Sequence, residues 1–360
     1  MTGALPLRRL VSGAPPPPDR ILFTEVWFRG HNNQRYVHLL PRLERVDRYH
    51  FLVSDRRLLR GLEFRALRAT APARHRAVFA AAQRRGYRFL LTCERQQIKH
   101  FQGSVVADCD DASFADEEVE LLKRPNVRAF VVVNDVVARR YEELGVRKPC
   151  YVIPHGVSLS DIDATAVSAI ARRYRTDGDV VVGYMASWLL SAGDRAGDNP
   201  RHNVDHLLDL WKELRTRMPN ARLWLLGAAS DRVRRSCEGQ ADILVLGRIP
   251  PERVLSYVAN FDVALYPRTA DEGHQASKVA EYMGCGVPTV SYDYAVTADL
   301  RASGAGLLVR TPREFVAAVE RLASDEHLRS TVAAAARAAG ATRDFDVLAR
   351  QYAEILDRHL

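Results

Sequence analysis

Short apolar segments recur along almost the whole 360-residue chain, separated by longer stretches of mixed polarity. The segments are rich in β-branched residues and are bounded by Gly, Pro or Asp, which is typical of strands buried on both faces of a parallel sheet. We expect strands at residues 21–23, 51–53, 89–91, 105–107, 130–133, 151–153, 180–183, 223–226, 243–246, 263–266, 289–292 and 307–309.

Between these segments, apolar residues follow the period of an α-helix. Residues 204–217 place one apolar stripe on a single helix face, formed by Val204, Leu207, Leu208, Trp211 and Leu214. The alternation of strands and helices predicts an α/β fold with two doubly wound, Rossmann-like domains. Ligands of such sheets bind at the carboxyl ends of the strands, so two domains with facing carboxyl edges would enclose one cleft.

The boundary between the domains is expected after Pro154, because residues 158–178 are polar and carry little strand signal. Four consecutive prolines near the start indicate a disordered or extended lead-in. The expected organisation is a lead-in at 1–19, an N-terminal domain at 20–157, a linker at 158–178, a C-terminal domain at 179–343, and a final helix at 344–360 that packs back on the N-terminal domain.

Composition narrows the class of protein. Hydrophobic residues make up 47% and charged residues 27%, which is typical of a soluble globular chain, and no run of about 18 apolar residues predicts a membrane span. The five cysteines are odd in number and form no C-x-x-C pair, a pattern that favours reduced thiols over a disulfide framework or a zinc site. We therefore expect a cytoplasmic protein.

The net charge of +8 is unevenly distributed. Residues 56–88 hold ten arginines against a single acidic residue, Glu63. This stretch is either a solvated surface or a patch that meets an anionic acceptor or the anionic surface of a membrane. Nucleic acid is not expected as a partner, because no aromatic residues interleave with the arginines in a stacking pattern.

The clearest chemistry lies in residues 275–292, QASKVAEYMGCGVPTVSY. Ser277 is predicted to cap a short helix that Gly284 and Gly286 end. The free N–H groups at the start of this helix could hold a diphosphate, which would offset the unfavourable position of Lys278 in the first turn. Glu281 follows one turn later and could accept hydrogen bonds from two ribose hydroxyls. The alternative is a Lys278–Glu281 pair on a solvated face.

This block, with Lys278, Glu281, Tyr282, Met283, Gly286, Pro288 and Val290, resembles the donor-site signature K-x-x-E-Y-M-x-x-G-x-P-x-V of the family 4 retaining glycosyltransferases of the GT-B fold. Residues 150–158, CYVIPHGVS, and 246–267, LGRIPPERVLSYVANFDVALYP, resemble two further blocks of that family. The similarity runs from about residue 105 to residue 309. It implies two facing Rossmann-like domains, with a nucleoside-diphosphate sugar bound mainly by the C-terminal domain and the acceptor on the N-terminal side.

The resemblance also implies individual donor contacts. Glu281 would bind the ribose, the backbone of Arg248 and Ile249 would meet the base, and Gly183 and Ser187 would approach the diphosphate from a loop after the strand at 180–183. Arg201 and His202 stand where the family usually has a phosphate-binding lysine, and Gly30 lies in the loop that closes over the donor. The predicted donor-binding set also includes His274, Gln275, Ala276, Ser277 and Lys278.

One departure concerns the sugar contacts. The family typically has a second glutamate where this chain has Gly273, and Glu272 is one residue out of register. Glu272, His274 or Gln275 would then serve instead, or the backbone would make these contacts.

The strand at 105–107 leads into Asp108, Cys109, Asp110 and Asp111. Many family members carry a histidine near the position of Asp110, close to the reacting sugar carbon. Asp110 and Asp111 are therefore the candidate catalytic residues, which could orient a hydroxyl acceptor or stabilise positive charge on the sugar. They could instead cap a helix predicted at 113–122. His31 could also be catalytic, or it could be a surface or capping group. No metal or other cofactor is expected.

The sequence thus predicts an enzyme that transfers a hexosyl-type sugar from a nucleoside-diphosphate sugar to a hydroxyl acceptor, with retention of configuration. Two alternatives remain open. One is a sugar-nucleotide epimerase on the same fold, and the other is a non-catalytic sugar-nucleotide-binding protein with a degenerate site. A nicotinamide-dependent oxidoreductase is not expected, because no G-x-G-x-x-G follows a predicted strand.

Overall fold

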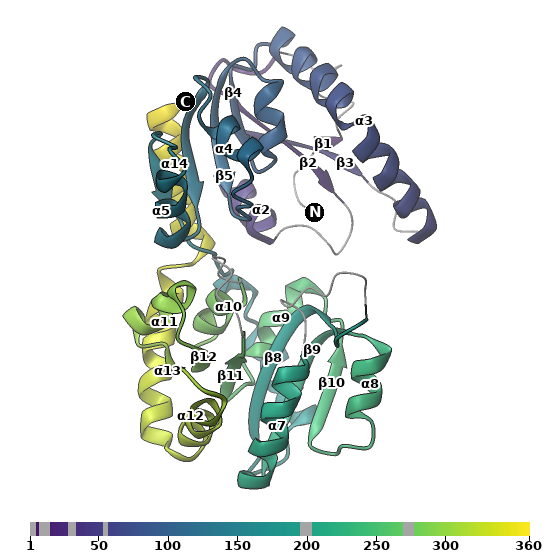
Figure 1. Ribbon diagram of the computed structural model, residues 1–360, viewed down its shortest axis with the longest axis vertical. Helices are drawn as coiled ribbons and strands as arrows, with labels where there is room; N and C mark the ends of the chain where they lie inside the picture. The colour runs from purple at the N-terminus through teal and green to yellow at the C-terminus, as the bar shows by residue number, and fades with distance from the viewer. Residues whose placement is uncertain (1–4, 7–14, 28–33, 53–56, 195–203, 269–276) are drawn as a thin grey trace. The chain divides into compact units, whose positions relative to one another are not determined.

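The computed structural model describes residues 5–6, 15–27, 34–52, 57–194, 204–268 and 277–360. The chain divides into two compact units (Figure 1). Unit 1 comprises Met1–His155 and Phe345–Leu360, and unit 2 comprises Gly156–Asp344. Each unit has its own sheet and its own hydrophobic core, as the spacing of the apolar segments predicts.

Unit 1 is built on a seven-stranded sheet in the order β1-β3-β2-β4-β5-β6-β7, with parallel pairing throughout. Its strands are β1 (Leu5–Pro6), β2 (Ile21–Trp27), β3 (Val46–Leu52), β4 (Phe89–Thr92), β5 (Ser104–Cys109), β6 (Val127–Val132) and β7 (Cys150–Val152). Its helices are α2 (Gln34–Leu39), η1 (Leu40–Arg42), α3 (Arg57–Arg84), η2 (Arg95–Lys99), α4 (Asp116–Leu122), α5 (Asp135–Glu143) and α14 (Phe345–His359).

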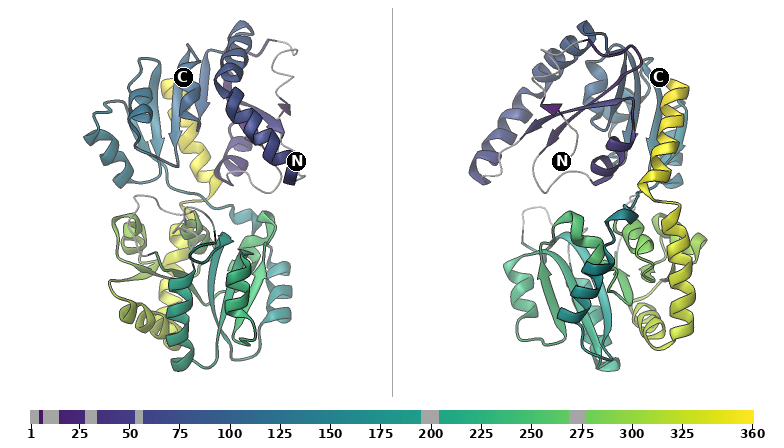
Figure 2. Two further views of the ribbon diagram at one scale, coloured as in Figure 1. Left: turned by 45° about the vertical axis from the view of Figure 1, so that its right-hand side comes forward. Right: turned by 180° about the vertical axis from the view of Figure 1, so that it is seen from behind.

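Helices cover both faces of this sheet, as a parallel sheet with two apolar faces requires. One core cluster packs α3, α4 and α5 against the sheet through residues such as Phe79, Val119 and Tyr141. The other packs α2 and α14 against the opposite face through Leu39 and Tyr352. Figure 2 shows α14, the C-terminal helix, lying along the strands of unit 1. The end of the chain therefore completes the core of the first unit.

Unit 2 is built on a six-stranded parallel sheet in the order β10-β9-β8-β11-β12-β13. Its strands are β8 (Val180–Leu189), β9 (Ala221–Ala229), β10 (Ile243–Gly247), β11 (Val263–Tyr266), β12 (Thr289–Tyr292) and β13 (Gly306–Val309). Its helices are η3 (Leu159–Asp161), α6 (Ala164–Tyr174), α7 (Asp205–Arg217), α8 (Asp231–Cys237), α9 (Pro251–Val258), α10 (Lys278–Gly284), η4 (Ala295–Thr297), α11 (Ala298–Ser303), α12 (Pro312–Ser324) and α13 (Glu326–Ala341).

All twelve expected strands overlap strands of the structure. Two segments that were predicted to have no regular secondary structure contain a strand or a helix. Leu5–Pro6, in the lead-in predicted to be disordered, forms a short strand because it pairs with β3. Residues 158–178, predicted as a linker, contain α6, which Asp163 caps by accepting hydrogen bonds from the N–H groups of Thr165 and Ala166.

Candidate functional site

The strand order of the unit 2 sheet reverses at β8. From β8 the chain first adds β9 and β10 on one side, and then adds β11, β12 and β13 on the other. Loops that leave two neighbouring parallel strands in opposite directions open a crevice at the carboxyl edge, where ligands of doubly wound sheets bind. The ends of β8 and β11, and α10 that follows β11, therefore define the candidate site.

Lys278 begins α10 and reaches across to β8. Its Nζ lies 3.2 Å from the hydroxyl oxygen of Tyr184 and 4.4 Å from the centre of the Tyr184 ring. Lys278 is half-buried, and this burial lowers the pKa of its ammonium group to about 8, with Arg268 adding a repulsive contribution. An aromatic ring and a neutral hydroxyl compensate only partly for lost hydration. The ammonium group would therefore gain from contact with an anion.

Glu281 lies one turn further along α10. It is half-buried, and burial raises the pKa of its carboxyl group to about 7, although attraction to Lys278 acts in the opposite direction. Within the described part of the chain, no group donates a hydrogen bond to this carboxylate. A partly desolvated acceptor with no donor is costly, so hydroxyl groups of a ligand would stabilise it. The solvated-face alternative does not fit the burial of either side chain.

Packing fixes the position of α10. The N–H of Met185 on β8 donates to the hydroxyl of Tyr282, at 3.1 Å, which joins the helix to the central strand. On the other side α10 meets α13 backbone to backbone, since a Cβ atom on Gly340 would lie 2.6 Å from the Cα of Gly284. A larger residue at Gly340 would push α10 away from α13, and one at Gly284 would collide with the side chain of Val157. Lys278 and Glu281 are thus carried by a helix held from two sides.

The predicted capping role of Ser277 is wrong. Ser277 already has right-handed helical dihedrals, with φ −52° and ψ −31°, and its side chain makes no capping hydrogen bond. Its carbonyl instead accepts the N–H of Glu281 at 3.2 Å. A capping side chain needs an extended backbone to fold back over the first turn, and Ser277 does not have one.

The loop expected after Gly183 is also wrong, because β8 continues to Leu189. Pairing with β9 extends to the end of this strand and shifts register between Met185 and Trp188. Gly183 is buried within the sheet, where a Cβ atom would lie 2.1 Å from the ring of Phe261. Ser187 is exposed at the register shift. Packing against Phe261 is therefore the reason that position 183 is a glycine.

Arg248 and Ile249 directly follow β10. Arg248 is exposed, and its guanidinium carbon lies 5.9 Å from the centre of the Trp188 ring at the end of β8. Ile249 is half-buried and packs against the core cluster that contains Trp224 and Phe261. Trp188 was not among the predicted site residues. No local signal in the sequence indicates Trp188, because Arg248 belongs to a distant segment that only the fold brings beside it.

Several predicted donor residues lie outside the described part of the chain. They are Gly30, Arg201, His202, His274, Gln275 and Ala276. The same holds for His31 and for Glu272 and Gly273, which concern the departure from the family pattern.

In unit 1, the predicted catalytic carboxylates follow β5. Asp108 is fully buried and pairs with Arg35 of α2, whose Nε lies 3.1 Å from Oδ2 of Asp108. Asp110 is half-buried and accepts a hydrogen bond from the hydroxyl of Tyr36 at 3.1 Å. Asp111 is exposed. The capping alternative is wrong for both Asp110 and Asp111, because α4 begins only at Asp116 and its N-cap position is Ala115.

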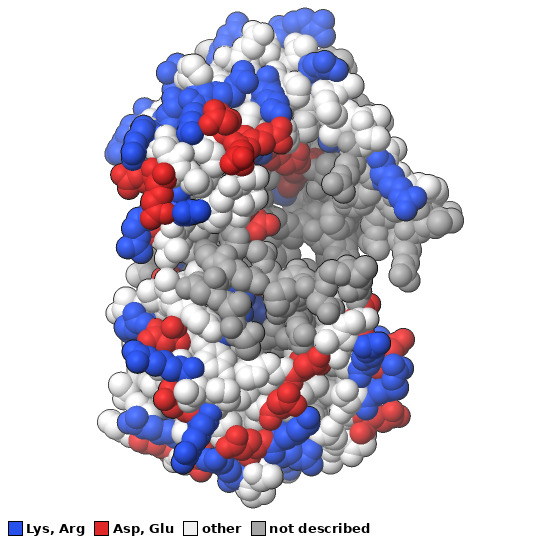
Figure 3. All heavy atoms as spheres, viewed as in Figure 1, with Lys and Arg blue, Asp and Glu red and all other residues white. Residues whose placement is uncertain are grey.

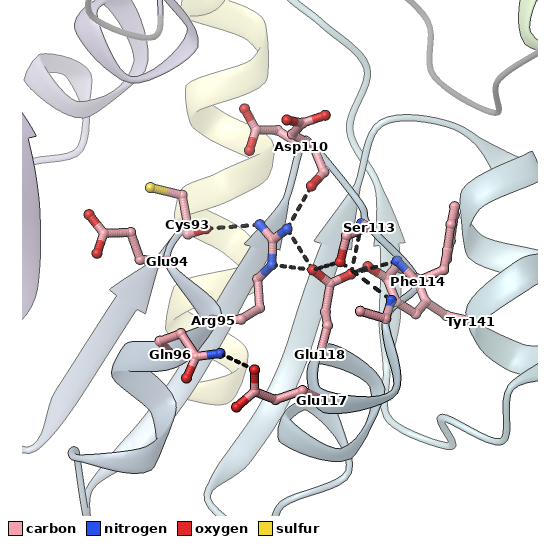
Figure 4. A network of polar contacts seen from close by, with 12 residues as sticks. Cys93, Glu94, Arg95, Gln96, Asp110, Ser113, Phe114, Glu117, Glu118 and Tyr141 are labelled. Atoms are coloured by element: carbon pink, nitrogen blue, oxygen red, sulfur yellow. Dashed lines mark hydrogen bonds and ion pairs between the residues drawn. The ribbon is translucent and has the colours of Figure 1, made fainter. Parts of the chain in front are cut away.

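A partly buried ion pair between Arg95 and Glu118 holds the loop that carries these carboxylates (Figure 4). Arg95 donates to Glu118 at 2.7 Å, to the carbonyl of Cys93 at 2.9 Å and to the carbonyl of Asp111 at 2.6 Å. Glu118 also accepts hydrogen bonds from Ser113 and from the hydroxyl of Tyr141. Sequence reasoning missed this network because its members are far apart along the chain.

Two general features bear on the site. Among the described residues, no group of three or more His, Cys, Asp or Glu side chains is arranged to hold a metal ion. The same part of the chain contains no helix that is both long enough and apolar enough to cross a membrane.

Comparison with known proteins places this geometry in a context. No curated protein matches the sequence. The fold is similar to that of Anabaena HepE in complex with UDP and glucose, with a TM-score of 0.71 at 17% identity over 94% of this chain and 99% of that one. It is also similar to sucrose-phosphate synthase from Thermosynechococcus elongatus, with a TM-score of 0.71 at 15% identity over 94% and 98% of the two chains.

A third similar structure is WaaG, a glycosyltransferase involved in lipopolysaccharide biosynthesis, with a TM-score of 0.64 at 12% identity over 93% of this chain and 99% of that one. Residues 188–325 match the family described as "Glycosyl transferases group 1". This match spans β9 to β13 and includes α10 with Lys278 and Glu281. The chain therefore has the GT-B fold, and residues 188–325 of its second unit are similar to the glycosyl transferases group 1 family.

Proposed function

We propose that this protein transfers a hexosyl group from a nucleoside-diphosphate sugar to a hydroxyl acceptor with retention of configuration, as a family 4 glycosyltransferase. The observation that carries the proposal is the Lys278–Glu281 pair. Both side chains are half-buried at the carboxyl edge of a doubly wound parallel sheet, and burial moves the pKa of each side chain toward neutrality. Groups in this state gain from a ligand that supplies the opposite charge and the missing hydrogen bonds.

A nucleoside diphosphate supplies both. Its phosphate charge would stabilise the ammonium form of Lys278, and two ribose hydroxyls would donate to the carboxylate of Glu281. The bound nucleotide in similar structures is UDP or UDP-glucose, so we take UDP as the first donor nucleotide to test. The exposed guanidinium of Arg248 and the Trp188 ring would border the base.

The chemical step needs little from the protein beyond positioning and charge stabilisation. In retaining transfer of this type, the leaving diphosphate oxygen can itself assist the incoming hydroxyl. The carboxylate of Asp110 would orient the acceptor or stabilise positive charge on the sugar. We propose that no metal takes part, because the ammonium group of Lys278 would neutralise charge on the leaving diphosphate.

Two alternatives give different results in the same assays. A sugar-nucleotide epimerase would change the sugar configuration without transferring the sugar to a hydroxyl acceptor. A non-catalytic binding protein would bind nucleotide without turnover. The match of residues 188–325 to a transferase family favours transfer over both.

The test combines calorimetry with UDP, ADP and GDP and a screen of nucleotide sugars for slow donor hydrolysis. We expect one nucleotide to bind and its sugar conjugate to be hydrolysed with release of the diphosphate. Lys278→Met should weaken binding about tenfold or more, through loss of a charge-assisted contact. Lys212→Met, which removes an exposed lysine from α7, is the matched control. Absence of binding by all three nucleotides would contradict the proposal.

We further infer that α3 places this cytoplasmic enzyme on an anionic membrane surface, where a membrane-associated acceptor would be found. Arg65, Arg76 and Arg84 are exposed on α3, and Leu62 is 56% exposed. At 3.6 residues per turn these four side chains fall within about a third of the helix circumference. Figure 3 shows basic side chains along α3. Such a face is complementary to acidic headgroups, at about 1 kcal/mol for each arginine near the surface.

Flotation with vesicles tests this inference. The protein should float with vesicles that contain phosphatidylglycerol and remain behind with pure phosphatidylcholine. Replacing the three arginines by glutamine should weaken vesicle binding about 100-fold. The matched control replaces three exposed arginines of unit 2, namely Arg173, Arg253 and Arg313. Equal loss of flotation in both triple variants would refute a specific role for α3.

A further inference from the structure

Helix α2 contributes two successive buried residues to the end of β5. The Nε of Arg35 lies 3.1 Å from Oδ2 of Asp108, and the hydroxyl of Tyr36 lies 3.1 Å from Oδ1 of Asp110. Arg35 is 3% exposed and Tyr36 is 2% exposed. Asp108 and Asp110 are two positions apart at the end of a strand, so they lie on the same face, the one that α2 covers. The intervening Cys109 packs into the core on the opposite face.

Other elements prevent α2 from moving. Arg35 also donates to the carbonyls of Ile153 and Pro154 after β7, at 3.0 and 2.8 Å. Tyr352 of α14 hydrogen-bonds both Arg35 and Asp108. Removing one member of such a buried network would leave a charge uncompensated, so the arrangement is strongly held. The C-terminal helix therefore locks α2 against β5.

We propose that Tyr36 is a positioning residue, which holds the carboxylate of Asp110 in one orientation for the acceptor. This rests on the proposed function, in which Asp110 acts on the acceptor or the reacting sugar. Arg35, Asp108 and Tyr352 fix the backbone and helix from which Tyr36 reaches Asp110. Burial keeps the pKa of Tyr36 well above its ordinary value, so its hydroxyl remains a hydrogen-bond donor throughout the working pH range. A carboxylate held in this way needs little reorganisation when the acceptor binds.

Tyr36→Phe tests the proposal, because it removes only the hydroxyl. Tyr87→Phe is the matched control, since the hydroxyl of Tyr87 also donates to a carboxylate, that of Asp47, at 2.6 Å. Asp47 lies near the amino-terminal end of β3, whereas Asp110 follows the carboxyl-terminal end of β5, so the two carboxylates lie at opposite ends of the strands. We expect Tyr36→Phe to lower kcat about tenfold with the donor KM and UDP affinity unchanged, whereas Tyr87→Phe leaves kcat unchanged.

A double-mutant cycle separates positioning from a general structural effect. In the Asp110→Asn background, Tyr36→Phe should produce no further loss of the residual turnover. An equal loss in both backgrounds, or a parallel loss of UDP affinity, would overturn the proposal.

Crystal structures of Tyr36→Phe and Tyr87→Phe give a readout independent of turnover. The Asp110 side chain should occupy more than one rotamer in Tyr36→Phe and a single rotamer in Tyr87→Phe. A single, unchanged Asp110 rotamer in Tyr36→Phe would overturn the positioning role even if the transferase proposal holds. Conversely, if the wild type turns over no donor, the proposed function fails while the rotamer comparison still decides the role of Tyr36.

Discussion

Replacing Glu281 by glutamine should stabilise the ligand-free protein and weaken nucleotide binding. The pKa of this carboxyl group rises from its ordinary value of 4.5 to about 7 in the folded protein. The unfolded chain therefore loses this proton at a lower pH than the folded chain does. Stability should fall as pH rises from about 4.5 to about 7, and the penalty is complete above pH 7. Glutamine cannot ionise, so the variant avoids this penalty.

The expected magnitude follows from the size of the pKa difference. Each unit corresponds to about 1.4 kcal/mol, so the full difference would give about 3 kcal/mol. Glu281 is only half-buried, and solvent screening reduces this to about 1–2 kcal/mol. For a domain of the size of unit 2, this corresponds to a rise in Tm of about 2–8 °C at pH 8, and to a much smaller change at pH 5.

Binding should change in the opposite direction. Loss of charge-assisted hydrogen bonds from two ribose hydroxyls should weaken UDP binding by about 10- to 100-fold. Scanning calorimetry at pH 5 and pH 8 and titration calorimetry with UDP measure the two effects. Glu326→Gln, at an exposed position of α13, is the control and should change neither by much. A lower Tm for Glu281→Gln at pH 8, or unchanged UDP affinity, would refute the reasoning.

Three further predictions concern packing, catalysis and metal dependence. Gly183→Ala should lower the Tm, because a Cβ atom 2.1 Å from the ring of Phe261 would overpack the sheet and reduce the free energy of unfolding by about 1–3 kcal/mol. A second change, Phe261→Leu, should restore part of this loss. An unchanged Tm for Gly183→Ala would contradict the packing argument. Asp110→Asn should reduce turnover about 100-fold with UDP binding kept, and normal turnover would remove it from the reaction. Treatment with EDTA should leave the transfer rate unchanged, and restoration of a lost rate by Mg²⁺ would show that a metal takes part.

The strand pattern was predictable because a parallel sheet covered on both faces needs continuous apolar segments. One exception is β3, where the apolar segment at 51–53 includes only the end of a strand that begins at Val46. The rest of β3 is polar, yet it is stable in the sheet because Asp47 binds Arg20 and Tyr87, and Arg48 pairs with Glu25. These compensating partners are distant in sequence, so the local pattern does not indicate a strand.

The candidate site also combines residues that the sequence pointed to with residues that only the fold brought to attention. The place of Lys278 and Glu281 on one short helix was predictable because their spacing is a local property of the sequence, whereas their donor-binding roles stay predictions. Trp188, Tyr184 and Tyr36 were missed because each acquires its contact from another element of the fold. The predicted approach of Gly183 to the diphosphate stays a prediction, and the packing of Phe261 against Gly183 is visible only in the fold.

Hydrophobic periodicity and a few local motifs thus determine the alternating strands and helices, the two sheets and the helix that carries Lys278 and Glu281. The tertiary structure alone decides how far each side chain is buried, which charges are compensated and which residues hold the carboxylates after β5. Periodicity reports on the few residues around each position, whereas burial and charge compensation depend on atoms that come from segments tens to hundreds of residues away.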